Sequence, residues 1–177
     1  MTAQVTFRQA CERDPGLLAE MYDGAARWML RNGIDQWKPG GKDAAHFRER
    51  LAGGEVWLAC HGSREVGAYE LWWEDEQAWG RQAPVAGYVH RLMTVRGAAP
   101  AGAGRALLAH AEGRIAAAGR TVARLDCLTS NPRLRAYYEA AGYRAVGEEP
   151  GKLAADGTCY GVTLMERVLP GGPVSRS

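Results

Sequence analysis

The residues whose spacing most clearly suggests chemistry form a small-residue turn, Gly102-Ala103-Gly104. The stretch that begins at Gly87 and leads into this turn is rich in Tyr, Val, Leu and Met, which predicts a strand. The stretch after the turn predicts a helix, because apolar residues recur at helical spacing: Leu107, Leu108, Ala111, Ile115 and Ala118. A glycine turn at a helix N-terminus is an anion site, since the first helical amides lack acceptors and the helix dipole favours negative charge. Taken alone, the turn is equally compatible with a tight connection that binds nothing.

Two common phosphate-binding motifs do not fit this turn. A dinucleotide-binding turn follows the pattern G-x-G-x-x-G, and Leu107 stands where its third glycine would be. A P-loop requires Gly-Lys followed by Ser or Thr, whereas this chain has Gly104-Arg105-Ala106. A plain nucleotide-binding domain is therefore the least favoured hypothesis.

The turn instead resembles the acetyl-CoA-binding motif Q/R-x-x-G-x-G/A of the GNAT N-acetyltransferases, here residues Ala99 to Gly104. Ala99 departs from the Gln or Arg of that motif, so the backbone amides would have to contribute more of the binding. A second stretch resembles the GNAT pattern N-x-x-A/L-x-x-F/Y-Y-E-x-x-G-F/Y, matched by Asn131, Leu134, Tyr137, Tyr138, Glu139, Gly142 and Tyr143. Two motifs in the right order, about 30 residues apart, make chance a poor explanation. The resemblance covers essentially the whole chain and is strongest from Gly87 to Glu148.

The resemblance implies a set of contacts to the cosubstrate acetyl-CoA. The backbone of Met93 and Val95 would pair with the pantetheine arm, and the amides of Gly102 to Arg105, including those of Ala103 and Gly104, would receive the pyrophosphate. The remaining candidates are Asn131, which a helix-cap role explains equally well, and the side chains of Arg96 and Arg105, whose guanidinium groups match phosphate geometry or could simply be solvated.

The resemblance also implies catalytic residues. Tyr138 matches the tyrosine that protonates the departing CoA thiolate in many family members; the alternative is a core tyrosine whose hydroxyl is bonded elsewhere. A general base is needed because only a neutral amine attacks a thioester, and His90 and Glu70 rank first, ahead of Asp126 and Glu74. An unperturbed imidazole titrates near pH 6.5, which suits this task. Many members of the family use a water relay instead.

Tryptophans are the candidates for an acceptor site. Trp37 lies in the Gly- and Pro-rich loop Gly33–Lys42 and could either cover a bound amine or seal the core, and Trp73 is the second candidate. Cys127 could in principle carry an acyl group, but its position within a predicted strand, without a matched histidine, indicates a core residue.

Composition restricts the partners. A net charge of +2 with no long basic run gives no support for nucleic acid or a membrane surface. The four cysteines lie far apart without a C-x-x-C pair, which argues against a metal site or a disulfide framework and favours reduced thiols. The N-terminus lacks an apolar signal core and no apolar run reaches the ~20 residues of a membrane helix, so a cytoplasmic location is expected.

The predicted elements follow the order β-α-α-β-β-β-α-β-α-β-β. This order predicts an α/β fold of GNAT type, with a mixed, mostly antiparallel central sheet of about 6–7 strands and helices on both faces. Asp14 is expected to cap the first helix, Asp43 the second, and His61 to Arg64 to join two strands as a hairpin. We expect one domain over residues 1–169 and a disordered tail over 170–177.

The favoured function is acetyl transfer from acetyl-CoA to a primary amine by direct attack, with no metal and no covalent enzyme intermediate. The acceptor could be a small molecule, an amino acid or an antibiotic. Two alternatives stay open: a non-catalytic acyl-CoA sensor and a protein N-terminal acetyltransferase. Exposed strand edges would permit a homodimer.

Overall fold

A hairpin forms the centre of the N-terminal half. In the computed structural model, which describes residues 4–154 and 157–171, β2 (Glu55–His61) and β3 (Arg64–Trp72) pair antiparallel across the turn Gly62-Ser63. Gly62 has a φ of +62°, a conformation that glycine adopts without steric cost. β1 (Thr6–Gln9) adds antiparallel to β2, with Thr6 opposite Cys60. The predicted hairpin is confirmed.

Two helices follow β1, and their starts differ in how they are capped. α1 (Pro15–Arg31) begins with proline and ends before Asn32-Gly33, as predicted. α2 (Ala44–Gly53) is capped by Asp43, which accepts a hydrogen bond from the His46 N–H at 2.9 Å. Asp14 occupies the N-cap position of α1, as predicted, but its side chain makes no capping hydrogen bond. Its carboxylate accepts hydrogen bonds from the Arg8 guanidinium instead, so a charge-assisted pair replaces the cap.

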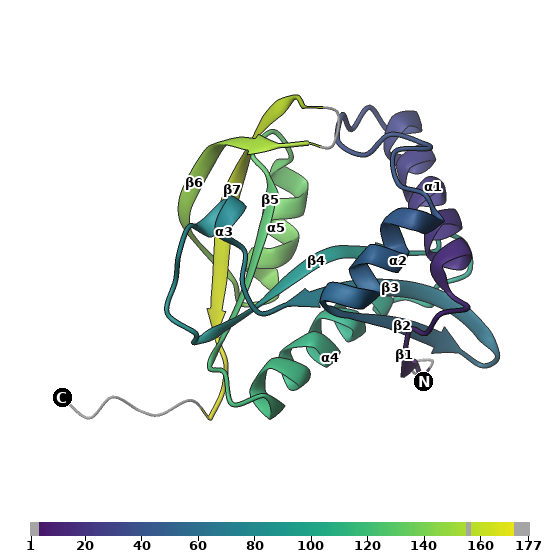
Figure 1. The fold of residues 1–177 in the computed structure, drawn as a ribbon, viewed down its shortest axis with the longest axis horizontal. Coiled ribbons are helices and arrows are strands. Elements are labelled where there is room, and N and C mark those ends of the chain that lie inside the picture. Colours follow the sequence, from purple (N-terminus) through teal and green to yellow (C-terminus); the bar gives the residue numbers. More distant parts are fainter. Residues whose placement is uncertain (1–3, 155–156, 172–177) are drawn as a thin grey trace. The chain divides into compact units, whose positions relative to one another are not determined.

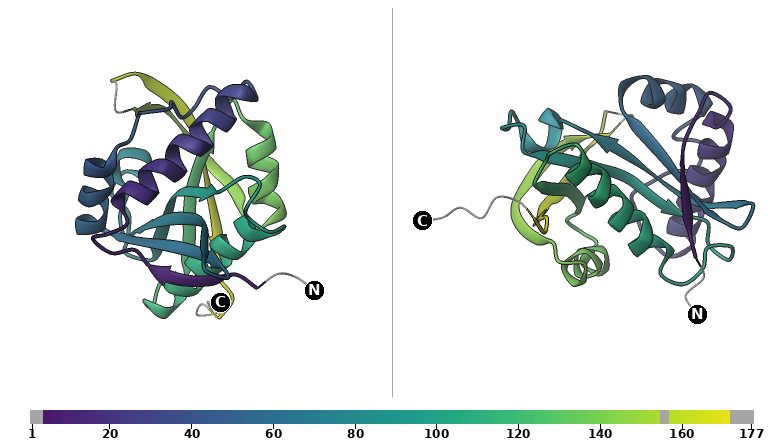
Figure 2. Two further views of the ribbon diagram at one scale, coloured as in Figure 1. Left: turned by 90° about the vertical axis from the view of Figure 1, so that its right-hand side faces the viewer. Right: turned by 90° about the horizontal axis from the view of Figure 1, so that it is seen from below.

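Both faces of β3 are covered, as its alternating residues show. Ala68 belongs to a buried cluster with Leu18 and Met21 of α1 and Phe47 of α2. Gly67 faces the other way: a Cβ there would lie 2.8 Å from Leu107 of α4 (Ala103–Ala117). Figures 1 and 2 show α1 and α2 on one side of these strands and the start of α4 on the other. Of the apolar positions predicted for α4, Leu107, Leu108, Ala111 and Ile115 are buried, whereas Ala118 lies beyond the helix and is exposed.

The C-terminal half is built on a second group of strands. β4 (Ala86–Thr94) pairs parallel with β5 (Val122–Leu128) over Ala86–Tyr88, β5 pairs antiparallel with β7 (Cys159–Val168), and β7 with β6 (Arg144–Leu153). α5 (Pro132–Ala140) follows β5 and ends before Gly142, whose φ is +96°. A short helix, α3 (Glu76–Trp79), has no counterpart in the predicted order of elements; Asp75 caps it by accepting a hydrogen bond from the Ala78 N–H.

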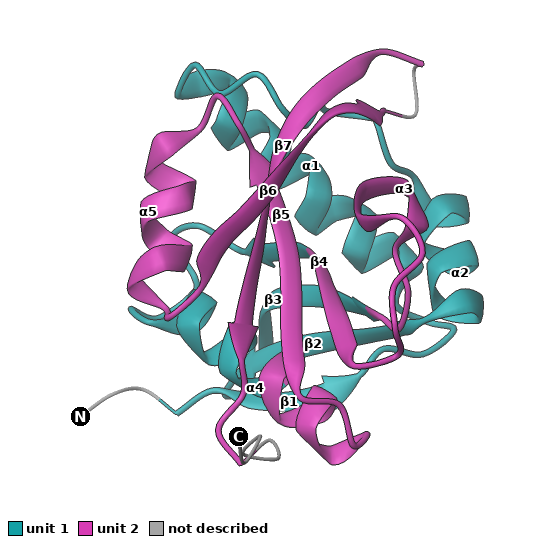
Figure 3. Cartoon of the chain, turned by 90° about the vertical axis from the view of Figure 1, so that its left-hand side faces the viewer, with its two compact units in different colours: residues 1–71, 91–110 teal, residues 72–90, 111–177 magenta. Residues whose placement is uncertain are grey.

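The strand order is β1-β2-β3-β4-β5-β7-β6 in a seven-stranded, mostly antiparallel sheet, which confirms the predicted fold class. The chain divides into two compact units, residues 1–71 with 91–110 and residues 72–90 with 111–177 (Figure 3). The single domain over residues 1–169 stays a prediction, and most of the predicted tail, residues 172–177, lies outside the described residues. Within the described part of the chain, no helix has the length and apolar character needed to cross a membrane.

Candidate active site

The predicted phosphate turn lies at the start of α4, in the first unit. The Gly102 carbonyl accepts the first helical hydrogen bond, from Ala106 at 3.0 Å, and the Ala103 N–H donates to Pro100 at 3.1 Å. Among the described residues, the N–H groups of Gly102, Gly104 and Arg105 have no acceptor. Three backbone donors at the positive end of a 15-residue helix are thus available to an anion.

The two glycines of this turn serve different purposes. Gly102 has a φ of +83°, so the backbone conformation alone explains a glycine at this position. Gly104 is helical and has no such requirement. A side chain at Gly104 would therefore test ligand access without straining the backbone.

The residues just before the turn are already engaged in packing and hydrogen bonding. Met93 is 3% exposed and belongs to the core cluster of the first unit. The Val95 N–H donates to Val66 of β3 at 2.8 Å, and the Val95 carbonyl accepts from Ala98 and Ala99, so Val95 has no free backbone donor for pantetheine. The Arg96 guanidinium stacks on Trp28, with Cζ 3.6 Å from the ring centre.

Asn131 directly precedes α5 and Tyr138 lies within it, both in the second unit. Asn131 caps the helix by accepting from the Leu134 N–H at 3.1 Å. The Tyr138 ring is buried between the edges of Tyr137 and Tyr143, and its hydroxyl has no hydrogen-bond partner among the described residues. Burial, with a smaller effect of the neighbouring Tyr137, raises the pKa of Tyr138 above its ordinary value. The phenol therefore keeps its proton at neutral pH.

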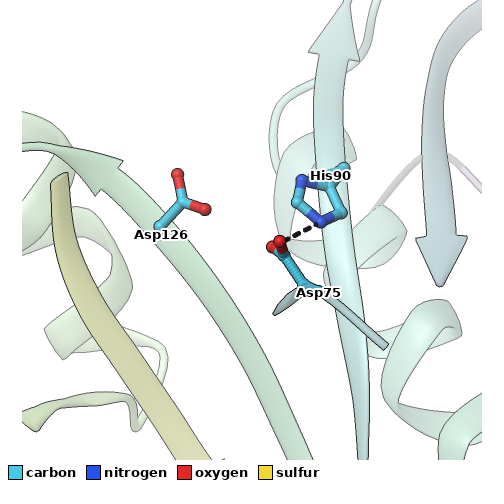
Figure 4. A group of neighbouring side chains, drawn as sticks. All are labelled: Asp75, His90 and Asp126. Carbon is cyan, nitrogen blue, oxygen red and sulfur yellow. Dashed lines mark ion pairs between the residues drawn. The ribbon is translucent and has the colours of Figure 1, made fainter. Parts of the chain in front are cut away.

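A polar group on the second unit surrounds His90 of β4 (Figure 4). His90 Nε2 lies 3.0 Å from Oδ2 of Asp75, and Asp126 of β5 accepts a hydrogen bond from Lys152 Nζ at 2.7 Å. The contact to His90 is close but not aligned as a hydrogen bond, because Asp75 Oδ2 has no hydrogen-bond partner of ordinary geometry. His90 Nδ1 has no partner in the described part of the chain, so its lone pair can accept a proton.

The charge state of Asp75 follows from its neighbours. Burial acts to raise the pKa of Asp75, but the His90 imidazole, the charge of Lys152 and the Ala78 N–H together lower it below its ordinary value. Asp75 is therefore a carboxylate at neutral pH and can stabilise a positive charge on His90. Sequence reasoning named His90 and Asp126 but missed Asp75 and Lys152. The cap position of Asp75 could have been recognised, whereas Lys152 has no motif around it.

Asp75, His90 and Asp126 could also hold a metal ion, since one ligand atom from each lies within 4.8 Å of the others. The Lys152 ammonium already occupies the Asp126 carboxylate, so a cation there would have to displace it. The arrangement suits proton transfer between paired groups better than ion binding.

Glu70, the other predicted base, lies on β3 in the first unit and is 1% exposed. Its Oε2 accepts from Arg91 Nη1 at 2.8 Å and lies 3.6 Å from Arg50 Nε. Two guanidinium groups therefore contact one oxygen of this carboxylate, and its second oxygen, Oε1, is buried.

The two candidate tryptophans differ in their surroundings. Trp37 stacks on the buried Tyr22, with ring centres 5.0 Å apart, and packs against the core cluster of the first unit. Trp73 lines a cavity of about 200 Å³ in the second unit, together with Asp75 and Tyr88.

Cys127 is buried as predicted, and this burial raises the pKa of its thiol to about 11, so it is a poor nucleophile at neutral pH.

Solved structures with the same fold are numerous. A GNAT-family acetyltransferase from Listeria monocytogenes superposes with a TM-score of 0.75 at 24% identity, covering 93% of this chain and 95% of that one. YncA from Salmonella typhimurium, solved with its cofactor acetyl-CoA, gives 0.65 at 16% identity, with 98% of both chains covered. PaiA N-acetyltransferase from Thermoplasma acidophilum, in complex with coenzyme A, gives 0.69 at 16% identity over 93% of this chain and 99% of that one.

No curated protein matches the sequence. A family model described as an acetyltransferase (GNAT) domain matches residues 28–154, well over half of the chain. This match includes the glycine turn, His90 and Tyr138. The chain therefore belongs to the GNAT family and is an acyltransferase that uses acetyl-CoA as its cosubstrate.

Proposed function

We propose that the protein transfers the acetyl group of acetyl-CoA to a primary amine of a small molecule by direct attack. The observation that carries this proposal is the His90–Asp75 pair, with Nε2 at 3.0 Å from the carboxylate and Nδ1 without a partner among the described residues. An imidazole held in this way can take a proton from an incoming ammonium or amine, and the carboxylate stabilises the imidazolium that forms.

The proposed reaction has two proton transfers. The amine nitrogen forms a C–N bond to the thioester carbonyl carbon as His90 takes its proton. The C–S bond then breaks, and Tyr138 gives its phenolic proton to the CoA sulfur. The Tyr138 hydroxyl makes no hydrogen bond to a described residue, which leaves its proton available for this role.

Each part of the cosubstrate has a proposed contact. The N–H groups of Gly102, Gly104 and Arg105 bind the pyrophosphate, and the Arg105 guanidinium is a further candidate contact to it. The Ala103 N–H and both backbone groups of Val95 are already hydrogen-bonded, and Arg96 is stacked on Trp28, so these residues contribute less. Asn131 remains a candidate contact to the CoA arm. His90 ranks ahead of Glu70 as the base, because arginines bind Glu70.

Direct attack is favoured over a covalent intermediate. Cys127 is the cysteine of the β5 strand, and its buried thiol has a pKa of about 11, so little thiolate forms at neutral pH. An acetyl-enzyme on this residue would also require the acyl group to enter the core.

The central experiment is a thiol-release screen with acetyl-CoA and a library of amines, accompanied by calorimetric titration of acetyl-CoA. We expect binding of acetyl-CoA and free CoA release with at least one class of small amine. Binding without release would favour the acyl-CoA sensor, and release with peptide N-termini alone would favour the protein N-terminal acetyltransferase. Absence of acetyl-CoA binding would overturn the proposal.

The role of the pair is tested with Asp75→Asn and His90→Gln. Asn keeps the cap of α3, so the fold should be retained while the negative charge is lost. We expect a lower kcat for both variants, because Asp75→Asn removes the carboxylate that stabilises the imidazolium formed during the reaction and His90→Gln removes the base itself. If EDTA abolishes activity and a divalent ion restores it, the three residues bind a metal instead.

A further inference from the structure

A small cavity in the second unit is formed by the segment around α3 and by β4. Its volume is about 200 Å³, and its lining includes Trp73, Glu74, Asp75, Glu76, Arg81 and Tyr88. One water takes up ~30 Å³ of liquid volume, so the cavity has room for a small group of several heavy atoms. Pockets for whole drug-sized ligands are larger. The cavity, which we call the acidic cavity, is therefore suited to one end of a small molecule.

Carboxylates outnumber cations in the lining of the acidic cavity. Glu74, Asp75 and Glu76 contribute three carboxylates, and Arg81 contributes one guanidinium. Arg81 Nε lies 3.9 Å from Glu76 Oε1, so these two charges offset one another. Glu74 is exposed and has no ion pair among the described residues. Glu74 and Asp75 thus give the cavity an excess of negative charge.

Asp75 provides an observation that does not depend on the number of carboxylates. Only 9% of its side-chain surface is exposed, although the residue as a whole is half-buried. Its Oδ1 accepts a hydrogen bond from the Ala78 N–H at 3.2 Å, whereas Oδ2 makes no hydrogen bond to a described residue. His90 Nε2 lies 3.0 Å from Oδ2 but is not aligned to donate to it. A desolvated carboxylate oxygen without a donor costs free energy, and a cation bound in the cavity would supply that donor.

Two aromatic rings complete the lining. The Tyr88 hydroxyl is engaged by Arg124 Nη1 at 3.0 Å, and Arg124 in turn pairs with Glu166, so this arginine adds no uncompensated charge. The Trp73 ring already contacts one cation, since Arg120 Cζ lies 5.3 Å from its centre. Aromatic faces attract cations through the ring quadrupole. Rings together with carboxylates favour an ammonium group over a neutral group of the same size.

We propose that the acidic cavity binds a second, positively charged group of the acceptor, so that the acceptor is a small diamine. This inference rests on the proposed acetyl transfer to an amine. Asp75 lines the cavity and also lies beside His90 (Figure 4), so a cation in the cavity is close to the proposed base within the same unit. The remote ammonium lies in the cavity while the reacting amine faces His90. Glu74 supplies the carboxylate that is not shared with His90.

The first test compares matched acceptors in the thiol-release assay: diaminobutane, aminobutanol and butylamine, followed by shorter and longer homologues. We expect a KM for the diamine at least about tenfold below that for the amino alcohol, because only the diamine can place one charge in the cavity and an amine at the base. The homologues identify the chain length that spans the two positions. Equal use of the diamine and the amino alcohol would overturn the inference while leaving the acetyltransferase proposal intact.

The second test uses Glu74→Gln, which removes a charge at an exposed position of the lining. Glu148→Gln is the matched control, because Glu148 is exposed in the same unit and does not line the cavity. Glu74→Gln should raise the KM for diaminobutane about fivefold, leaving the KM of aminobutanol and of acetyl-CoA unchanged. Glu148→Gln should change none of these values. A Glu74→Gln variant that shifts diamine and amino alcohol equally, or shifts neither, would contradict the proposal.

A third measurement does not depend on turnover. The chain contains six tryptophans, and the indole N–H signal of Trp73 can be assigned by NMR with Trp73→Phe. Titration with diaminobutane should shift this signal to saturation, whereas neutral butanediol and sodium chloride of equal ionic strength should not. Asp75→Asn should weaken the response. The signal of Trp28, which lies in the first unit against Arg96, should stay in place. If diaminobutane does not move the Trp73 signal, the cavity is not a cation site, whatever the thiol-release screen shows.

Discussion

Two carboxylates, the buried Glu70 and the half-buried Asp75, have different partners. Glu70 binds two arginines, which already neutralise its charge. Asp75 faces a single imidazole and can respond to its protonation. A carboxylate assists proton transfer when its partner can gain and lose a proton during the reaction, and a histidine side chain can do so whereas an arginine side chain cannot. This difference is the residue-scale reason to assign proton transfer to His90 and anchoring to Glu70.

At the same scale, Tyr138→Phe should fold normally and lose turnover. The ring stays between Tyr137 and Tyr143, so packing is kept, and only a hydroxyl without a partner among the described residues is removed. Loss of a general acid typically costs ~10²–10⁴ in rate. Steady-state kinetics with acetyl-CoA and an accepted amine give kcat, and a thermal melt checks the fold.

Tyr143→Phe is the matched control for this experiment. The Tyr143 hydroxyl donates a hydrogen bond to Glu112 at 3.0 Å. Its removal should lower the free energy of unfolding by about 1 kcal/mol, and the melting temperature with it, without a large change in kcat. A Tyr138→Phe enzyme that keeps most of its kcat would assign the acid to water or to another group.

The sequence predicted those candidate site residues that lie within one continuous motif. It did not predict those that separate elements bring together. Tyr138, Asn131 and the glycine turn fall within local patterns. Asp75 and Lys152 meet His90 and Asp126 only because different strands and a capped helix place them there. The missing side-chain cap at the N-cap residue Asp14 has the same origin, because its carboxylate binds Arg8 of β1 in place of the first N–H groups of the helix.

At the scale of elements, the start of α4 is the clearest binding surface. Gly104→Val should weaken CoA binding by about tenfold or more, because a branched side chain would stand beside the amides that receive the pyrophosphate. Gly104 is helical, and valine has a higher helix propensity than glycine, so the helix itself should not suffer. Calorimetric titration of CoA measures the effect.

Gly113→Val is the matched control, since Gly113 lies in the same helix and a Cβ there meets nothing within 4 Å. It should bind CoA as the unmodified protein does. Similar affinities for the two variants would place the cosubstrate elsewhere. Gly102 is unsuitable for this comparison, because its positive φ makes any replacement a test of the backbone.

The loop before α2 gives the second element-scale prediction. Trp37→Ala should raise the KM of the acceptor far more than that of acetyl-CoA, if the indole covers the amine. The stacking of Trp37 on Tyr22 also predicts a lower melting temperature for this variant. Trp37→Phe separates the two effects, because it keeps an aromatic stack but shortens the covering surface. Parallel losses for both ligands in Trp37→Ala, with normal kinetics in Trp37→Phe, would identify a residue that only seals the core.

At the scale of the whole molecule, the fold could be predicted further than the site. The order of the long strands and helices could be predicted from periodicity and from glycine or proline boundaries. α3 was missed because four residues carry no helical period, and only the Asp75 cap marks its start. The order of the strands within the sheet could not be predicted, since pairing between distant strands leaves no local pattern.

Stability of the whole chain should depend on pH through Asp14. Its carboxylate accepts two hydrogen bonds from Arg8 and one from the Cys11 N–H, and Arg8 also contacts Glu65. The hydrogen bond from Arg8, opposed by burial, lowers the pKa of Asp14 from 3.8 to about 2. A carboxylate with a depressed pKa in the folded state stabilises that state at pH values above its ordinary pKa, and the contribution is lost as pH falls through the folded value.

Asp14→Asn should therefore be less stable at pH 7, by about 2 kcal/mol, and the deficit should shrink between pH 3.8 and about 2. Denaturant titrations of both proteins at stepped pH measure this difference, with the exposed Asp35→Asn as a control that should show none. A deficit that is the same at every pH would mean that Asp14 acts through packing and not through its charge.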